Sequence, residues 1–123
     1  MQHYSRARAF ERIVALIEQQ KGPLLRAGRG ATLVRWLDRL PDAVRAQHPV
    51  LHILLAEQHR IAGRTAEAHT AIQQVCDQLV PHASLHPALA AQALTVRANV
   101  QYTQGGYENA RRDCEAALQL LPN

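Results

Sequence analysis

Two stretches of this chain repeat one another at an offset of 42 residues, and this internal repeat constrains the fold more than any other feature. When Gly63 is aligned with Gly105, the small and apolar residues that follow keep the same spacing. The aligned pairs are Ala68 with Ala110, Ile72 with Cys114, Val75 with Ala117 and Cys76 with Leu118. A single unit of this length cannot bury its own apolar face, so such units are expected to stack on one another.

Glycine and proline divide the chain into segments of helix length. Apolar residues recur within them at steps of three and four, and no segment alternates apolar and polar residues as a strand would. The helices expected are residues 5–20, 31–40, 41–46, 49–62, 65–79, 87–103 and 108–121, with Lys21, Gly22 and Pro23 ending the first of them. The predicted fold class is therefore all-α.

The composition agrees with a folded helical domain and excludes several other classes. Apolar residues make up 47% of the chain and charged residues 20%, which argues against disorder. No apolar run is long enough to span a membrane, and the N-terminus has no apolar signal core. We therefore expect a cytoplasmic protein in which Cys76 and Cys114 are buried free thiols, although the count alone also permits one disulfide.

The formal charge of +4 is unevenly distributed along the sequence. Residues 1–47 hold nine basic and four acidic residues, whereas residues 48–123 hold five and six. A basic first third could contact nucleic acid. The arginines are spread out and do not form a block, which favours an ordinary solvated surface.

The end of the chain carries five landmarks in a fixed order: Ala98, Gly105-Gly106-Tyr107, Ala110, Ala117 and Pro122. In order and spacing they resemble the tetratricopeptide repeat (TPR), a helix pair of about 34 residues. Leu94 and Arg97 occupy positions where that family usually has Trp and Leu, so the first helix of this unit is atypical. The resemblance implies antiparallel helix-hairpin repeats stacked as a short TPR-like right-handed superhelix. Its parts would be an irregular helix pair in residues 1–47 and repeat units in residues 48–81 and 85–123.

A second pattern lies within residues 10–68. Its landmarks are Leu24-Leu25-x-x-Gly28, Thr32-Leu33-x-x-Trp36-Leu37-x-x-Leu40-Pro41, Pro49-x-Leu51 and Ala62-Gly63-Arg64-x-x-Glu67-Ala68. This set resembles the helical-repeat region of the MalT-like, LuxR-family transcriptional activators. Those proteins combine an ATP-binding module, superhelical repeats and a C-terminal DNA-binding helix-turn-helix. The resemblance covers the repeat region only, and it implies either a fragment of a long regulator or a free-standing relative.

Motifs for catalysis, cofactors and metals are absent from the sequence. It has no Gly-x-x-x-x-Gly-Lys-Ser/Thr phosphate loop, no Cys-x-x-Cys and no His-Glu-x-x-His. His52 and His59 share one helix face, but buried, hydrogen-bonded histidines are a simpler interpretation than a metal site. We expect Glu57 and Arg60 to form a surface ion pair, and Asp113 and Glu115 to form a solvated face with Arg111 and Arg112. The chain is not expected to be an enzyme, and no cofactor or metal is predicted.

A candidate binding surface follows from the expected stacking, in which the first helix of each pair lines the concave side. The equivalent outward positions are Ile53, Glu57 and Arg60 in one unit and Thr95, Asn99 and Tyr102 in the next. Their mixture of apolar, charged and hydrogen-bonding groups suits a peptide segment or a small effector. The alternative is ordinary solvated surface. Lys21 is the only lysine, so capture of a peptide C-terminus by a lysine–asparagine clamp is not expected.

The leading hypothesis is a non-catalytic, TPR-like module that binds a protein segment or a small-molecule effector within a bacterial MalT/LuxR-type transcriptional regulator. DNA would then be contacted only through another domain, and no membrane would be involved. A free-standing interaction scaffold and nucleic-acid contact by the first third are the alternatives. We also expect truncation at Asn123, with an apolar patch at Leu118 and Leu121, because another helix would normally cover the last turn. Self-association through the exposed terminal helices stays open.

Overall fold

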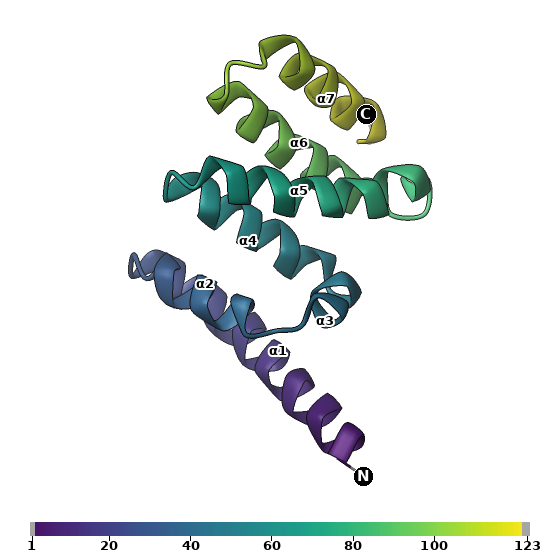
Figure 1. The fold of residues 1–123 in the computed structure, drawn as a ribbon. Helices are drawn as coiled ribbons and strands as arrows, with labels where there is room; N and C mark the ends of the chain where they lie inside the picture. The colour runs from purple at the N-terminus through teal and green to yellow at the C-terminus, as the bar shows by residue number, and fades with distance from the viewer. Residues whose placement is uncertain (1, 122–123) are drawn as a thin grey trace. The chain divides into compact units, whose positions relative to one another are not determined.

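The structure, a computed structural model, describes residues 2–121, with side chains from residue 8 onward. Its elements are α1 (Gln2–Arg26), α2 (Gly30–Asp38), α3 (Asp42–Gln47), α4 (Pro49–Ile61), α5 (Thr65–Leu79), the 3-10 turn η1 (Val80–His82), α6 (Pro87–Thr103) and α7 (Tyr107–Leu120), as Figure 1 shows. No strand occurs in residues 2–121, so the prediction of an all-α fold is confirmed. In the same residues no helix has the length and apolar content needed to cross a bilayer.

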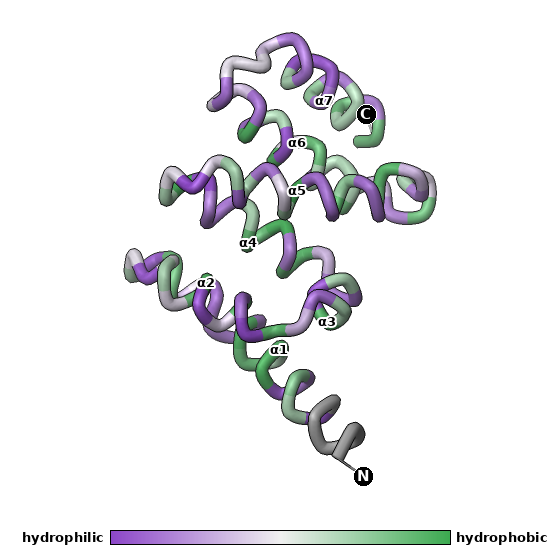
Figure 2. The backbone as a smooth tube through the Cα atoms, viewed as in Figure 1, coloured by the Kyte–Doolittle hydropathy of each residue, from purple (hydrophilic) through white to green (hydrophobic). Residues whose placement is uncertain are grey.

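Two compact units divide the chain, an N-terminal unit (Met1–His48) and a C-terminal unit (Pro49–Asn123). Figure 2 shows short hydrophobic and hydrophilic stretches mixed along the helices, as is typical of helices with one apolar face. The N-terminal unit contains α1, α2 and α3, and the C-terminal unit contains α4 to α7. Each unit is described separately below.

Three helices end in the same turn, at Gly28, Gly63 and Gly105, where φ is +73°, +81° and +84°. In each turn the glycine N–H donates to the carbonyl three residues earlier, and the next N–H donates to the carbonyl five residues earlier. The second set of bonds joins Arg29 to Leu24, Arg64 to His59 and Gly106 to Gln101, each at 2.8 Å. This is the Schellman motif, which needs a left-handed residue after the helix. Only glycine adopts that conformation without a Cβ penalty.

The first helix is longer than predicted. We expected Lys21, Gly22 and Pro23 to end it, but α1 continues through Pro23 to Arg26. Pro23 has no N–H to donate to the carbonyl four residues earlier in the helix. Because Pro23 is exposed, that carbonyl can bond to water instead. Gly22 remains helical, and the Schellman turn at Gly28 ends the helix instead. A glycine–proline pair alone was therefore a misleading stop signal.

In the N-terminal unit α1 packs on α2, and α3 is tied to the end of α2 by one arginine. Arg45 donates from Nη1 to the carbonyls of Leu37 and Leu40, at 2.9 Å each. Its guanidinium also pairs with Asp42. A cation at a helix C-terminus satisfies free carbonyls and opposes the helix dipole. The buried apolar residues of this unit are Val14, Ile17, Leu33, Val34, Leu37 and Leu40.

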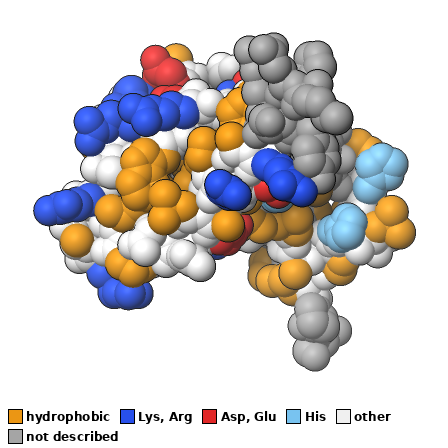
Figure 3. Space-filling model, turned by 90° about the horizontal axis from the view of Figure 1, so that it is seen from below, with side chains coloured by type: hydrophobic (Ala, Val, Ile, Leu, Met, Phe, Trp, Pro, Cys, Tyr) orange, Lys and Arg blue, Asp and Glu red, His pale blue; other side chains and the backbone are white. Residues whose placement is uncertain are grey.

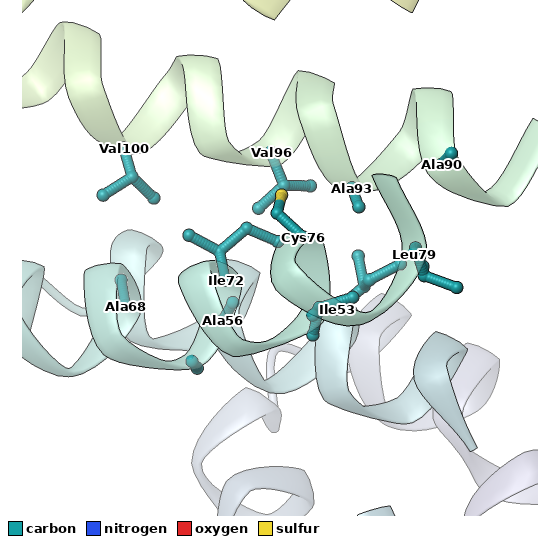
Figure 4. Close-up of a cluster of buried hydrophobic side chains, with 12 residues drawn as sticks. Ile53, Ala56, Ala68, Ile72, Cys76, Leu79, Ala90, Ala93, Val96 and Val100 are labelled. Atoms are coloured by element: carbon teal, nitrogen blue, oxygen red, sulfur yellow. The ribbon is translucent and has the colours of Figure 1, made fainter. Parts of the chain in front are cut away.

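In the C-terminal unit each helix packs on the next, and α4 also lies beside α6. Figure 4 shows Ile72 and Cys76 of α5 pointing toward α6, where Val96 and Val100 point back. Five small residues of these helices are buried, namely Ala56, Ala68, Ala98, Ala110 and Ala117. Small side chains at a contact reduce the distance between helix axes, so these alanines set the spacing of the stack.

Candidate binding surface

Five of the six residues predicted to form a binding stripe are accessible to solvent. Glu57 and Arg60 of α4 are half-buried, and Thr95, Asn99 and Tyr102 of α6 are exposed. Because α4 lies beside α6, these residues belong to two neighbouring helices of one compact unit. Thr95 donates its hydroxyl to the carbonyl of Ala91 at 2.8 Å, which leaves its oxygen free to accept.

The sixth residue, Ile53, was predicted to point outward, and that prediction is wrong. Its side chain is 2% exposed and belongs to the core cluster that α4, α5 and α6 share. We had placed Ile53 on the concave side of the stack, which the first helix of each pair was expected to line. Since α4 also packs beside α6, two of its faces are covered, and Ile53 lies where they meet.

Glu57 and Arg60 form the ion pair that their spacing predicted. Arg60 Nε donates to Glu57 Oε1 at 3.1 Å, and a second guanidinium nitrogen pairs with the same oxygen. The hydrogen bond raises the pKa of Arg60 above its ordinary value. Glu57 Oε2 is buried and accepts no hydrogen bond from a described residue. The pair therefore presents little net charge to a ligand.

An aromatic pair that the sequence analysis did not single out borders the stripe. The rings of Tyr102 and Tyr107 meet edge to face, with centroids 5.0 Å apart and planes at 63°. Both are largely solvent-accessible, at 66% and 61% exposure. They stand on either side of the Gly105 turn, which brings the end of α6 close to the start of α7. Tyrosines with an apolar ring and a polar tip are enriched in binding surfaces.

The interior of the α6–α7 hairpin contains an ion pair, and one of its residues was predicted to face solvent. Asp113 was expected on a solvated face, but it is buried and accepts two hydrogen bonds from Arg97, at 2.7 and 2.8 Å. These bonds raise the pKa of Arg97. The equivalent positions of the α4–α5 hairpin hold Leu55 and Ala71, both buried. Arg97 and Asp113 therefore place an ion pair at positions where the preceding hairpin has two buried apolar residues. Arg111 and Glu115, by contrast, lie on an exposed face as expected, and Arg111 pairs with Glu108 as well as with Glu115.

Both cysteines are free, as expected, but only one is buried. Cys76 lies in the core, where burial raises the pKa of its thiol to about 11. Such a thiol is a poor nucleophile at neutral pH. Cys114 was also predicted at a packing position, and that prediction is wrong because the side chain is exposed. It occupies the face of α7 that no described helix covers.

The histidines do not form a metal site in the described residues, where no group of three or more potential ligands occurs. His52 and His59 are buried, in agreement with their interpretation as core histidines. Arg64 Nε donates to His59 Nδ1 at 2.9 Å, so that ring nitrogen carries no proton. The bond also links α4 to the residue that precedes α5.

The basic residues of the N-terminal unit are partly neutralised by neighbours, because Lys21 pairs with Glu18 and Arg45 with Asp42. On the face drawn in Figure 3, lysine and arginine side chains lie at several places, with hydrophobic and uncharged side chains between them. The basic residues visible there do not form one continuous patch.

Comparison with known proteins identifies no matching model of a protein family, no similar curated protein and no similar solved structure.

Proposed function

We propose that this chain is a non-catalytic binding module, a short TPR-like superhelix that recognises a peptide segment of a partner protein or a small effector. We place it within a bacterial MalT/LuxR-type transcriptional regulator. Support comes from the Schellman turn that closes all three helix pairs and from the sequential packing of α4 to α7. Both features are expected of stacked helix-hairpin repeats.

The observation that carries the proposal is the accessible stripe on two neighbouring helices. Glu57 and Arg60 on α4, and Thr95, Asn99 and Tyr102 on α6, are separated by helical steps of three and four and remain accessible to solvent. They include one internally neutralised ion pair, one amide, one hydroxyl and one exposed aromatic ring. A surface of this kind combines hydrogen-bonding groups with an apolar contact, as peptide-binding surfaces do.

The chemistry of the stripe favours an extended peptide over a charged ligand. The amide of Asn99 both donates and accepts, which matches the peptide unit of a bound segment. The exposed ring of Tyr102 can cover an apolar side chain. Arg60 is already paired with Glu57, and the only lysine lies in α1, so no free cation of α4 or α6 is available to bind a terminal carboxylate. We therefore propose internal peptide segments as the preferred ligands.

The test is selection of peptides from a random display library on the purified full chain, followed by affinity measurements with variants. Asn99→Ala and Tyr102→Ala should each weaken the selected peptides by about 10-fold or more, the loss typical of a contact at the centre of an interface. Asn109→Ala is the matched control, because Asn109 is an exposed asparagine on α7. Failure to select any peptide would contradict the proposal, as would peptides that bind the Asn99 and control variants equally well.

A free-standing scaffold is the alternative, and one observation favours it. Part of the Trp36–Pro41 phrase has a structural explanation, because the side chains of Leu37 and Leu40 are buried in the core of the N-terminal unit. That role needs no relation to transcription. The flanking gene sequence separates the two candidates: a phosphate-loop ATPase and a helix-turn-helix in the same reading frame would support the regulator, and their absence would support the scaffold.

A further inference from the structure

The outer face of α6 carries no unpaired charge. Its exposed side chains beyond the first turn are Gln92, Thr95, Asn99, Tyr102 and Thr103. Arg97 is the single charged residue of α6, and it is bound to Asp113 inside the α6–α7 hairpin. A ligand that lies along α6 therefore meets amides, hydroxyls and an aromatic ring.

Two amides form a regular row of hydrogen-bond donors on this face. Thr95 and Thr103 give their hydroxyl protons to carbonyls of their own helix, at 2.8 and 2.9 Å, so neither hydroxyl is free to donate. The exposed amides of Gln92 and Asn99 each offer two N–H donors to a ligand. These two residues are seven positions apart, close to two helical turns. They therefore share one row and lie about 10 Å apart along the helix axis.

The aromatic pair stands at one end of this row. Tyr102 follows Asn99 by three positions and meets Tyr107 edge to face across the turn between α6 and α7. The two rings are 66% and 61% exposed. The charge beside Tyr107 is neutralised, because Glu108 pairs with Arg111. The rings therefore offer an uncharged apolar surface with two hydroxyl groups at its edge.

We propose that the amides of Gln92 and Asn99, together with the rings of Tyr102 and Tyr107, bind a proline-rich segment in the polyproline II conformation. This inference rests on the proposed function and names its class of ligand. Polyproline II has three residues per turn, and one turn spans about 9 Å. That length is close to the separation of the two amides. Carbonyls three residues apart can therefore accept from Gln92 and Asn99 in turn.

Proline suits this surface better than other segments for three reasons. Its ring packs on exposed aromatic rings, as in the grooves that bind proline-rich segments. A polyproline II backbone makes no internal hydrogen bonds, so its carbonyls are free to accept from amides, whereas a helical ligand has already used its own. A charged segment finds no unpaired charge on α6 to bind, since Arg97 is held by Asp113.

The experiment uses the purified full chain and two display libraries of uncharged peptides of about 12 residues, the length of four turns of polyproline II. One library has proline at every third position, and the other contains no proline. We expect the best proline peptides to bind at least about 10-fold more tightly than the best peptides of the other library, as measured with synthetic peptides by fluorescence anisotropy.

Variants outside the stripe on α4 and α6 test the amide row and the ring pair. Gln92→Ala and Tyr107→Leu should each weaken a selected proline peptide by about 10-fold. Tyr107→Phe keeps the ring and should retain most of the affinity. Gln119→Ala is the matched control for Gln92→Ala, because Gln119 is an exposed glutamine on α7. Circular dichroism verifies that each variant is folded.

Two results would overturn this inference and leave the proposed function intact. One is the selection of proline-free peptides that bind as tightly as the proline peptides and are weakened by Asn99→Ala. The other is a set of proline peptides that Asn99→Ala weakens but that Gln92→Ala and Tyr107→Leu leave unchanged. Failure of both libraries to yield any binder would contradict the proposed function as well.

Discussion

The ion pair between Arg97 and Asp113 allows a quantitative test of how the α6–α7 hairpin is held together. Its two hydrogen bonds join helices within one hairpin, and the side chains are only 19% and 10% exposed. The equivalent positions of the preceding hairpin hold Leu55 and Ala71. We therefore replace the charged residues with those found at the equivalent positions of the α4–α5 hairpin. The variants are Arg97→Leu, Asp113→Ala and the double variant.

The expected magnitudes follow from burial. Arg97→Leu leaves a buried carboxylate without its partner, which should lower the free energy of unfolding by about 3–5 kcal/mol. Asp113→Ala leaves a guanidinium on a long stem that can reach water, so its cost should be smaller, about 2 kcal/mol. The double variant should lie within about 1 kcal/mol of the wild type, because a buried pair and an apolar pair of similar volume are nearly equivalent.

The assay is urea denaturation of all four proteins followed by circular dichroism, with hydrogen exchange to locate the weakened amides in α6 and α7. A coupling free energy of roughly 3 kcal/mol or more is expected from the double-mutant cycle. Single variants that each cost less than about 1 kcal/mol and combine additively would refute the reasoning, since the pair would then behave as an exposed one.

Three further predictions concern the turns, the thiols and the core. Gly63→Ala should lower the free energy of unfolding by about 1–2 kcal/mol, because φ is +81° while the space around a Cβ is open; a change below about 0.3 kcal/mol would contradict that reading. The pKa of the Cys76 thiol rises from 9.0 to about 11 on folding, so stability should be intact below pH 9 and fall as the pH rises beyond it. Cys76→Ala should remove that slope in denaturation curves and Cys114→Ala should keep it. Ile53→Ala should cost about 2–5 kcal/mol of unfolding free energy and the exposed Ile61→Ala under about 0.5, and similar losses for both would contradict the burial of Ile53.

Local signals were sufficient to predict the helices of the C-terminal unit. Pro49 and Pro87 stand at the first positions of α4 and α6, where a proline lacks no needed donor. Gly63 and Gly105 stand just after the ends of α4 and α6 in the left-handed conformation. These residues act through their own backbone geometry, so their effect can be recognised without knowing the tertiary structure. The bounds expected for these helices accordingly differ from the observed ones by no more than a residue.

Local signals were insufficient where the end of a helix or the burial of a side chain depends on other residues of the fold. Pro23 is tolerated within α1 because its surroundings are exposed, and the true end at Gly28 depends on a residue that can reverse the chain. Ile53 and Cys114 were assigned to the wrong environments for a related reason. The helical period gives the face on which a residue lies, but whether that face is covered depends on which helix packs against it.

Arg97 and Asp113 show how such errors could be reduced in a chain with internal repeats. Arg97 was noticed as a departure from the pattern, and Asp113 was assigned to solvent, because each was considered alone. They are 16 residues apart, as are the residues that replace them in the preceding unit, Leu55 and Ala71. An apolar pair and an oppositely charged pair at the same two positions indicate that the positions face one another across the hairpin, since a buried charge needs a partner. Departures from a repeat should therefore be compared in pairs. When one buried apolar position of a repeat holds a charge, an opposite charge is expected at the position that faces it.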